Sequence, residues 1–174
     1  MKPLLLFFVI ALSLFAGRST LHIKAAANAY ESGKEALQQK QTEKAIQRFR
    51  QAIDIEPTFT DAFESLATAY LDSGHRLEAA RILTQLLEFE PDAAASRVLL
   101  GQILLKEGQP RRALAQFSLV LKRDQFNAGG LLGFASAARQ TGLSDRASEA
   151  LERGRQRYPK DARFKAAASA PNPQ

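Results

Sequence analysis

Hydrophobic positions recur along this chain with helical spacing, and the pattern repeats every 34 residues. The segments that end at Pro57 and Pro91 align with an offset of 34 residues, and Pro159 ends a third copy 68 residues after Pro91. Within one copy, apolar residues spaced three and four apart form one stripe and then a second, which predicts two amphipathic helices. The first stripe of the copy that begins at residue 60 consists of Phe63, Leu66, Ala67 and Tyr70. The pattern therefore predicts a repeated helical hairpin.

Four such repeats follow one another without insertion or deletion, at residues 26–59, 60–93, 94–127 and 128–161. Position 20 is always alanine, which lets two helix axes approach closely, and position 24 is always bulky, namely Phe49, Leu83, Phe117 and Leu151. Position 15 is Gly74, Gly108 or Gly142 in three repeats, where we expect a left-handed C-cap, and Lys40 in the first. A single hairpin cannot bury its apolar face, so the repeats must stack.

Helix ends and weak points can also be predicted. Pro110 fits the first residue of a second helix, whereas Ser144, Asp92 and Asn127 are candidate N-caps. Repeats one and four should be the least stable, because Ala29 and Ala36 pack weakly in the first helix of repeat one and four glycines lower helix propensity in repeat four: Gly129, Gly130, Gly133 and Gly154. Residues 162–174 predict a short capping helix, with Phe164 packed on the last repeat, and a disordered end.

These positions resemble the tetratricopeptide repeat (TPR) family, whose 34-residue unit has small residues at 8, 20 and 27, aromatics at 4, 11 and 24, and Pro at 32. The resemblance covers 136 of the 174 residues. It implies an all-α, right-handed α-solenoid of four helix-turn-helix repeats. Departures are Arg97 at position 4, Gln125 in place of proline and Gly154 at position 27.

In the TPR family, positions 2, 5, 9 and 12 of each first helix line a concave groove that binds proteins. The resemblance places there Tyr30, Lys34, Leu37, Glu64, Thr68, Leu71, Val98, Gln102, Leu105, Leu132, Ser136 and Arg139. The apolar members predict anchors for a partner's peptide or helix, and the polar members predict its orientation. An alternative is that the leucines pack between first helices or under the tail. The lysines and asparagines by which some relatives clamp a chaperone's C-terminal carboxylate are absent.

The N-terminus reads as an export signal. Lys2 precedes an uncharged apolar run at residues 4–17, which as a helix would span about 21 Å, less than the roughly 30 Å hydrocarbon core of a bilayer. That length is typical of a cleaved signal peptide. The alternative is an uncleaved membrane anchor within residues 1–25, with Arg18 and Lys24 at the interface. Both readings place the repeats outside the cytoplasm, in the periplasm, secreted or tethered to the membrane.

Composition argues against an enzyme. The chain has no Cys and only two His, which excludes thiolate metal sites and leaves little scope for histidine chemistry. The acidic residues near Pro57 and Pro91 are typical of solvated loops, and the glycines at 129–130 lack the lysine of a phosphate-binding loop. We therefore expect no catalytic residues, no metal and no cofactor.

The net charge of +6 is unevenly distributed. Residues 26–93 hold 7 basic and 12 acidic side chains, whereas residues 94–174 hold 14 basic and 6 acidic ones. Few aromatic rings accompany the basic run, which argues against nucleic acid. The polarity predicts salt-sensitive docking or head-to-tail self-association. A basic C-terminal patch is expected at Arg153, Arg155, Arg157 and Lys160.

Two functions follow. The first is a non-catalytic interaction scaffold outside the cytoplasm, which binds a partner in its concave groove and helps to assemble an envelope or secretion complex. The second is a membrane-tethered adaptor whose basic C-terminal half docks on anionic lipid or on an acidic partner.

Overall fold

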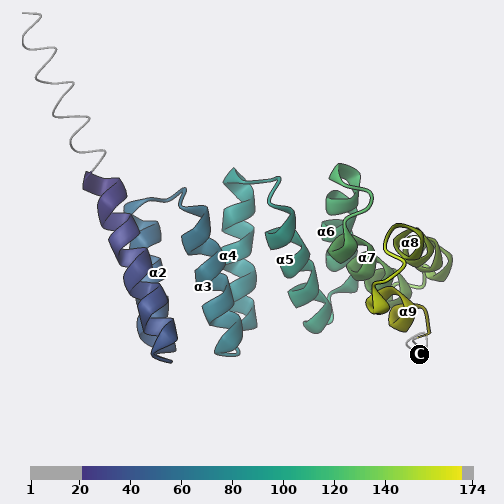
Figure 1. Cartoon of the computed structure of the whole chain (residues 1–174), viewed down its shortest axis with the longest axis horizontal. Coiled ribbons are helices and arrows are strands. Elements are labelled where there is room, and N and C mark those ends of the chain that lie inside the picture. Colours follow the sequence, from purple (N-terminus) through teal and green to yellow (C-terminus); the bar gives the residue numbers. More distant parts are fainter. Residues whose placement is uncertain (1–20, 170–174) are drawn as a thin grey trace, which may run out of the picture. The chain divides into compact units, whose positions relative to one another are not determined.

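The computed structural model describes residues 21–169, which form helices paired by short turns (Figure 1). The first described helix covers residues 21–38. It is followed by α2 (Thr42–Ile55), α3 (Thr60–Asp72), α4 (Arg76–Phe89), α5 (Ala94–Lys106), α6 (Pro110–Arg123), α7 (Ala128–Gln140), α8 (Ser144–Arg157) and α9 (Ala162–Ser169). The predicted all-α class and the helix-turn-helix pairing are confirmed. The predicted leader lies almost wholly outside the described residues.

The chain divides into an N-terminal body, Met1–His75, and a C-terminal body, Arg76–Gln174. The described part of the N-terminal body is built from helix 21–38, α2 and α3. Phe49 of α2 is fully buried against Gly33, where an added Cβ would lie 2.5 Å from its ring. Tyr30 packs its ring 5.7 Å from Phe49 and 5.0 Å from Phe59, centroid to centroid. Aromatic rings therefore fill the space beside the small residues of the first repeat.

In the C-terminal body, the corresponding ring is Phe117 of α6, which is fully buried between α5 and α7. A Cβ added at Gly101 would lie 2.6 Å from Phe117 Cζ, and one added at Gly133 would lie 2.1 Å from Cε1. No side chain fits at such distances, so both glycines let a neighbouring helix contact the ring. Gly133 costs helix propensity, as expected from the sequence, but its bare backbone is what allows α7 to pack on Phe117.

Each predicted left-handed C-cap is present. Gly74, Gly108 and Gly142 have φ of 80°, 67° and 80°, and Lys40 has φ of 58°. After α3, the amide of Gly74 donates to the carbonyl of Leu71 at 3.0 Å and that of His75 to Tyr70 at 2.8 Å. This pair of bonds is a Schellman motif, which satisfies carbonyls at the helix end. The same motif at Lys40 forces an L-residue into a conformation that suits glycine.

We expect Lys40→Gly to raise the free energy of unfolding by about 0.5–1 kcal/mol. The left-handed conformation costs an L-residue roughly 1–2 kcal/mol, and the entropy of a more flexible unfolded chain offsets part of that gain. Gly74→Ala is the matched reverse change, since an added Cβ there meets no atom within 4 Å and only backbone strain is introduced. Urea unfolding followed by circular dichroism should therefore show opposite shifts of the midpoint. A lower midpoint for Lys40→Gly would contradict this account.

Two of the four predictions about helix starts are confirmed. Asn127 caps α7 as predicted, since its Oδ1 accepts the amide of Gly130 at 2.8 Å. Pro110 begins α6, also as predicted. The other two predictions are wrong. Ser144 is the first residue of α8, with Leu143 at the cap, and Asp92 precedes the cap of α5 and instead pairs with Arg123 of α6 at 2.6 Å.

Helix α9 packs on the end of the C-terminal body through Phe164, which is fully buried. Its ring stacks on that of Tyr158 at 5.9 Å and lies so close to Gly154 that an added Cβ would be 2.0 Å from it. Asp161 accepts the Arg163 amide at 3.0 Å at the start of α9 and also binds the guanidinium, and these hydrogen bonds lower the pKa of Asp161. Gly154 at repeat position 27 thus makes room for the ring of the final helix.

Candidate functional site

The predicted groove residues of the C-terminal body lie on α5 and α7, and we call this surface the C-terminal first-helix face. It consists of Val98, Gln102, Leu105, Leu132, Ser136 and Arg139. Val98, Leu105 and Leu132 are half-buried, whereas Gln102 and Ser136 are exposed. A Cβ added at Gly129 of α7 would lie 3.0 Å from Val98 Cγ1 of α5, so the two first helices approach closely here. The face therefore combines partly accessible apolar side chains with exposed polar ones.

The N-terminal body carries the remaining predicted groove residues on helix 21–38 and α3. These are Tyr30, Lys34, Leu37, Glu64, Thr68 and Leu71, the N-terminal first-helix face. Leu37 and Leu71 are half-buried, and Thr68 is exposed with its hydroxyl donating to Glu64 O at 2.9 Å. Tyr30 belongs mainly to the packing around Phe59. This body repeats the pattern of half-buried apolar and exposed polar residues.

Lys34 is the exposed cation of the N-terminal first-helix face. Its Nζ pairs with Glu31 Oε2 at 3.0 Å and lies 5.4 Å from the centre of the Tyr30 ring. The hydrogen bond and charge of Glu31 raise the pKa of the Lys34 ammonium. Lys34 therefore stays protonated at neutral pH, where it can orient an anionic group of a partner.

Arg139 lies at the other limit of the candidate surface and is already engaged within the chain. Its guanidinium donates to the carbonyl of Ala167 in α9 at 2.7 Å. The capping helix thus occupies the end of the C-terminal first-helix face. Arg139 is therefore less available to a partner than the exposed Gln102 and Ser136 of the same face.

The four residues of the predicted basic patch do not act as one cluster. Arg153 is half-buried and donates to the carbonyl of Gln125 at 2.5 Å, and Arg155 lies 3.4 Å from Glu152. Arg157 lies over the rings of Phe126 and Tyr158, at 5.9 and 5.7 Å from their centres. Lys160 is exposed in the turn before α9. The basic residues therefore divide between packing and solvent.

Arg153 and Tyr158 both hold the turn before α7, where Gln125 replaces the expected proline. Arg153 holds the carbonyl of Gln125, and the Tyr158 hydroxyl donates to the carbonyl of Phe126 at 2.6 Å. These two hydrogen bonds thus restrict the turn at the place where the other repeats have a proline. The sequence offers no signal for these two hydrogen bonds, because they depend on how closely the end of α8 approaches the turn before α7.

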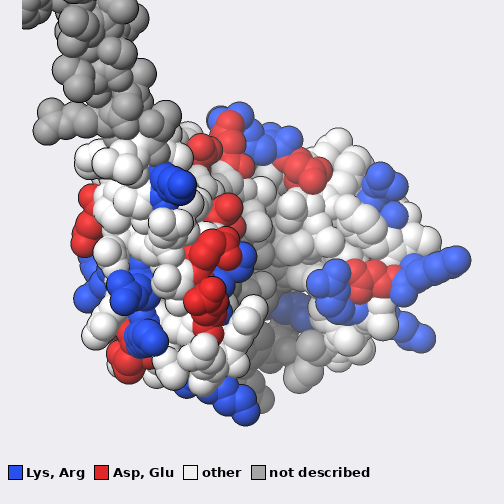
Figure 2. Space-filling view, turned by 60° about the vertical axis from the view of Figure 1, so that its left-hand side comes forward, with Lys and Arg blue, Asp and Glu red and all other residues white. Residues whose placement is uncertain are grey.

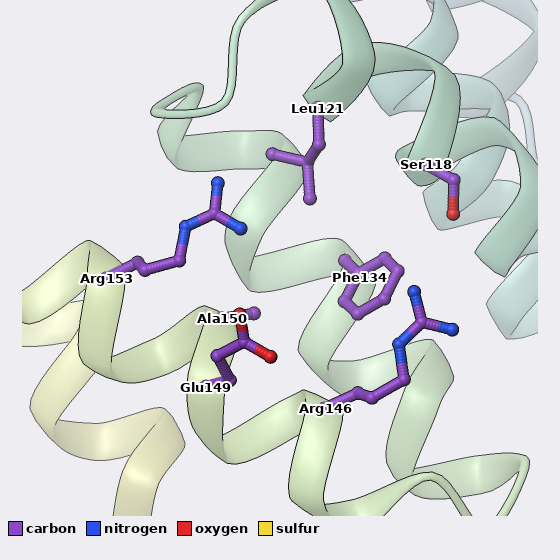
Figure 3. Close-up of a pocket in the computed structure, with 7 residues that line it drawn as sticks. All are labelled: Ser118, Leu121, Phe134, Arg146, Glu149, Ala150 and Arg153. Carbon is purple, nitrogen blue, oxygen red and sulfur yellow. The ribbon is translucent and has the colours of Figure 1, made fainter.

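In the C-terminal body, α6 and α8 flank a recess above α7, which we call the second-helix recess (Figure 3). It is lined by Ser118, Leu121, Phe134, Arg146, Glu149, Ala150 and Arg153, with a cavity volume of about 170 Å³. Sequence reasoning missed it, although Arg146 and Arg153, two helical turns apart on α8, were a usable signal.

The acidic residues and histidines of residues 21–169 are dispersed. No group of three or more His, Asp or Glu side chains there could hold a metal ion. His75 is exposed in a turn, where its ring meets the edge of Tyr70 at 6.2 Å. Figure 2 shows Lys and Arg interleaved with Asp and Glu on the face turned toward the viewer, which is not a continuous basic surface.

Residues 1–20 lie outside the described part of the chain. Within residues 21–169, no helix combines the length and apolarity that crossing a bilayer requires.

Comparison with known proteins gives the family. A family model described as tetratricopeptide repeat matches residues 36–103, 71–131 and 104–170, which together span most of the chain. The DnaJ homolog subfamily C member 3 of Rattus norvegicus is 35% identical over 92 residues, and the Homo sapiens protein is 34% identical. These matches cover 53% of this chain but only 18% of the relatives' length.

Solved structures share the fold at low identity. The MamA crystal structure aligns with a TM-score of 0.76 and 16% identity, covering 83% of this chain and 79% of MamA. YrrB, described as a TPR protein with an unusual peptide-binding site, aligns with a TM-score of 0.73 and 21% identity, covering 84% and 75%. PilF of Pseudomonas aeruginosa aligns with a TM-score of 0.66, 21% identity and coverage of 81% and 64%. From the 34-residue register, the paired helices and the family match, the chain belongs to the tetratricopeptide repeat family of non-catalytic protein-interaction scaffolds.

Proposed function

We propose that the chain binds a peptide or helix of a partner protein on its first-helix faces, outside the cytoplasm, in the assembly of an envelope or secretion complex. The observation that carries the binding surface is the row of half-buried Val98, Leu105 and Leu132 beside exposed Gln102 and Ser136. Such apolar side chains are partly open to solvent although the helices are otherwise well packed. A partner's apolar anchors would complete their burial, and the polar residues would set its orientation.

The location part of the proposal is supported by the sequence alone. An uncharged run at residues 4–17 behind Lys2 is typical of an export signal. Mass spectrometry of the mature N-terminus tests this point. A new N-terminus within residues 18–28 supports cleavage and export, whereas an intact Met1 on cytosolic protein would contradict it.

The binding surface is tested by charge insertion. We expect Leu71→Asp combined with Leu105→Asp to reduce capture of the native partner at least tenfold, because a carboxylate would be desolvated against the partner's apolar anchor. Quantitative mass spectrometry after affinity capture from the native source measures the loss. Both leucines are half-buried, so the fold should survive, and circular dichroism checks that it does.

The second candidate function, an adaptor that docks through its basic C-terminal half, is tested by a second variant beside the double leucine variant. Reversal of Arg155, Arg157 and Lys160 to glutamate tests docking through the basic C-terminal half, whose residues 94–174 carry 14 basic against 6 acidic side chains. On the first-helix account, this triple variant retains the partner. If it loses the partner while the double leucine variant keeps it, the adaptor function replaces the groove function.

A further inference from the structure

We propose that the second-helix recess binds an acidic peptide segment of a partner protein, in which two carboxylates flank an apolar side chain. The recess lies between the second helices α6 and α8, with α7 at its base, so it is separate from the residues of the first-helix faces (Figure 3). The inference goes beyond the proposed function and does not depend on it. It gives this protein a second contact surface.

Both arginines of the recess are held in place by neutral groups. The guanidinium of Arg146 lies 5.2 Å from the centre of the Phe134 ring, and that of Arg153 donates to the carbonyl of Gln125 at 2.5 Å. Neither contact neutralises the positive charge. A guanidinium has five N–H donors, so each retains donors for an incoming carboxylate, and the fixed positions reduce the entropy lost on binding.

The ion pairs among residues 21–169 leave both of these charges without a carboxylate partner. Glu149 is the acidic side chain of the recess and lies between the two arginines along α8. One carboxylate against two guanidiniums leaves an excess of positive charge. An anionic ligand is therefore favoured, and Glu149 should weaken its binding by repulsion.

The rest of the lining is apolar except for Ser118, whose hydroxyl donates to the carbonyl of Leu114 within α6, and it suits a side chain rather than a cofactor. Leu121, Phe134 and Ala150 lie between the two arginines in the close-up (Figure 3). The cavity of about 170 Å³ is smaller than the roughly 300–1,000 Å³ usual for small-molecule sites. A single aliphatic side chain of a partner is therefore the expected occupant of the space between the charges.

The spacing of the arginines sets the form of the segment. Arg146 and Arg153 are seven residues apart on one helix, which corresponds to about 10.5 Å along its axis. In an extended peptide the first, third and fifth side chains point to the same side, and the first and fifth residues lie about 13 Å apart. The long arginine and glutamate side chains span the small difference, so a segment with acidic residues at the first and fifth places and an aliphatic residue at the third fits the recess. Nucleic acid fits less well, because Phe134 is buried and offers no face for stacking.

The probe is the peptide acetyl-Glu-Gly-Leu-Gly-Glu-amide, titrated into the isotopically labelled full chain and followed by nuclear magnetic resonance. We expect saturable shifts of the arginine Nε–H signals assigned to Arg146 and Arg153. The peptide with both glutamates replaced by glutamine should produce no saturable shift at these signals. Replacing the leucine by glycine should weaken binding about threefold or more, because the apolar contact is lost.

Single substitutions on α8 then test which charged side chains contribute to peptide binding. Arg146→Gln should weaken binding about tenfold, because it removes a charge-assisted hydrogen bond, whereas Glu149→Gln should tighten it about threefold. Arg155→Gln is the matched control: it removes the same charge from α8 at an exposed residue outside the recess, next to Glu152, and should leave binding nearly unchanged.

Three results would overturn the proposal. One is an equal response to the glutamine peptide. Another is equal weakening by Arg155→Gln and Arg146→Gln, which would indicate general charge attraction. The third is an absence of localised peptide shifts while anionic phospholipid vesicles or a single-stranded oligonucleotide perturb the same arginine signals. The wild-type titration alone decides the first and third, so a variant that fails to fold does not leave the proposal untested.

Discussion

Replacing Phe117 by alanine is expected to lower the free energy of unfolding by about 3–5 kcal/mol. The ring is 0% exposed and fills the space between α5, α6 and α7. Gly101 and Gly133 lie against it so closely that neither could carry a Cβ without displacing it. Removing the ring leaves a cavity bounded by helix backbone, which can collapse only if whole helices shift. Chemical denaturation followed by circular dichroism measures the loss.

Leu119→Ala is the control for Phe117→Ala. Leu119 is on the same helix and is 45% exposed, so its truncation should change the unfolding free energy by no more than about 0.5 kcal/mol. A double-mutant cycle with Gly133→Ala sharpens the result. Alone, this change should destabilise through the clash with Phe117, whereas in the Phe117→Ala background it should stabilise by up to about 1 kcal/mol through helix propensity. Additive effects would contradict the packing described for this ring.

Replacing Phe164 by alanine is expected to detach the capping helix α9 from the C-terminal body. Phe164 is the buried residue of α9, and it rests on Gly154 and Tyr158. An eight-residue helix is too short to persist without tertiary packing, so its residues should unfold once the ring is gone. We expect amide hydrogen exchange at residues 162–169 to lose its protection and the unfolding free energy to fall by about 3 kcal/mol.

Lys165→Ala is the matched control for Phe164→Ala, because the neighbouring side chain is exposed. Exchange in α9 should then remain as slow as in the native chain. The detached helix would also release Arg139 from the carbonyl of Ala167. If residues 162–169 stay protected after Phe164→Ala, then Arg139 and the backbone contacts hold α9, and the account of the cap is wrong.

The hairpins were predictable from the sequence because their determinants are local. Position 20 is alanine in every repeat and is fully buried wherever it occurs, as Ala45, Ala79, Ala113 and Ala147 show. The glycines at position 15 have positive φ for the reason that their place in the repeat predicts. A periodic requirement of this kind leaves a trace in every copy.

Contacts between different helices left no such trace in the repeat pattern. The value of Gly133 follows from a ring in the preceding helix, and the role of Arg153 follows from a carbonyl 28 residues earlier. Ser144 failed as a cap because α8 begins one residue earlier than a serine cap requires. The second-helix recess depends on the separation of α6 and α8, which a one-dimensional pattern does not encode.

The central claim, that the first-helix faces bind the partner, is tested most directly by site-specific photo-crosslinking in the native source. A photoreactive residue replaces Leu105 on the first helix α5 in one variant and the exposed Leu77 on the second helix α4 in the other. We predict a discrete crosslinked product from position 105 that disappears when Leu71→Asp is added, and none from position 77. A partner that crosslinks at position 77 and not at position 105 would contradict the claim.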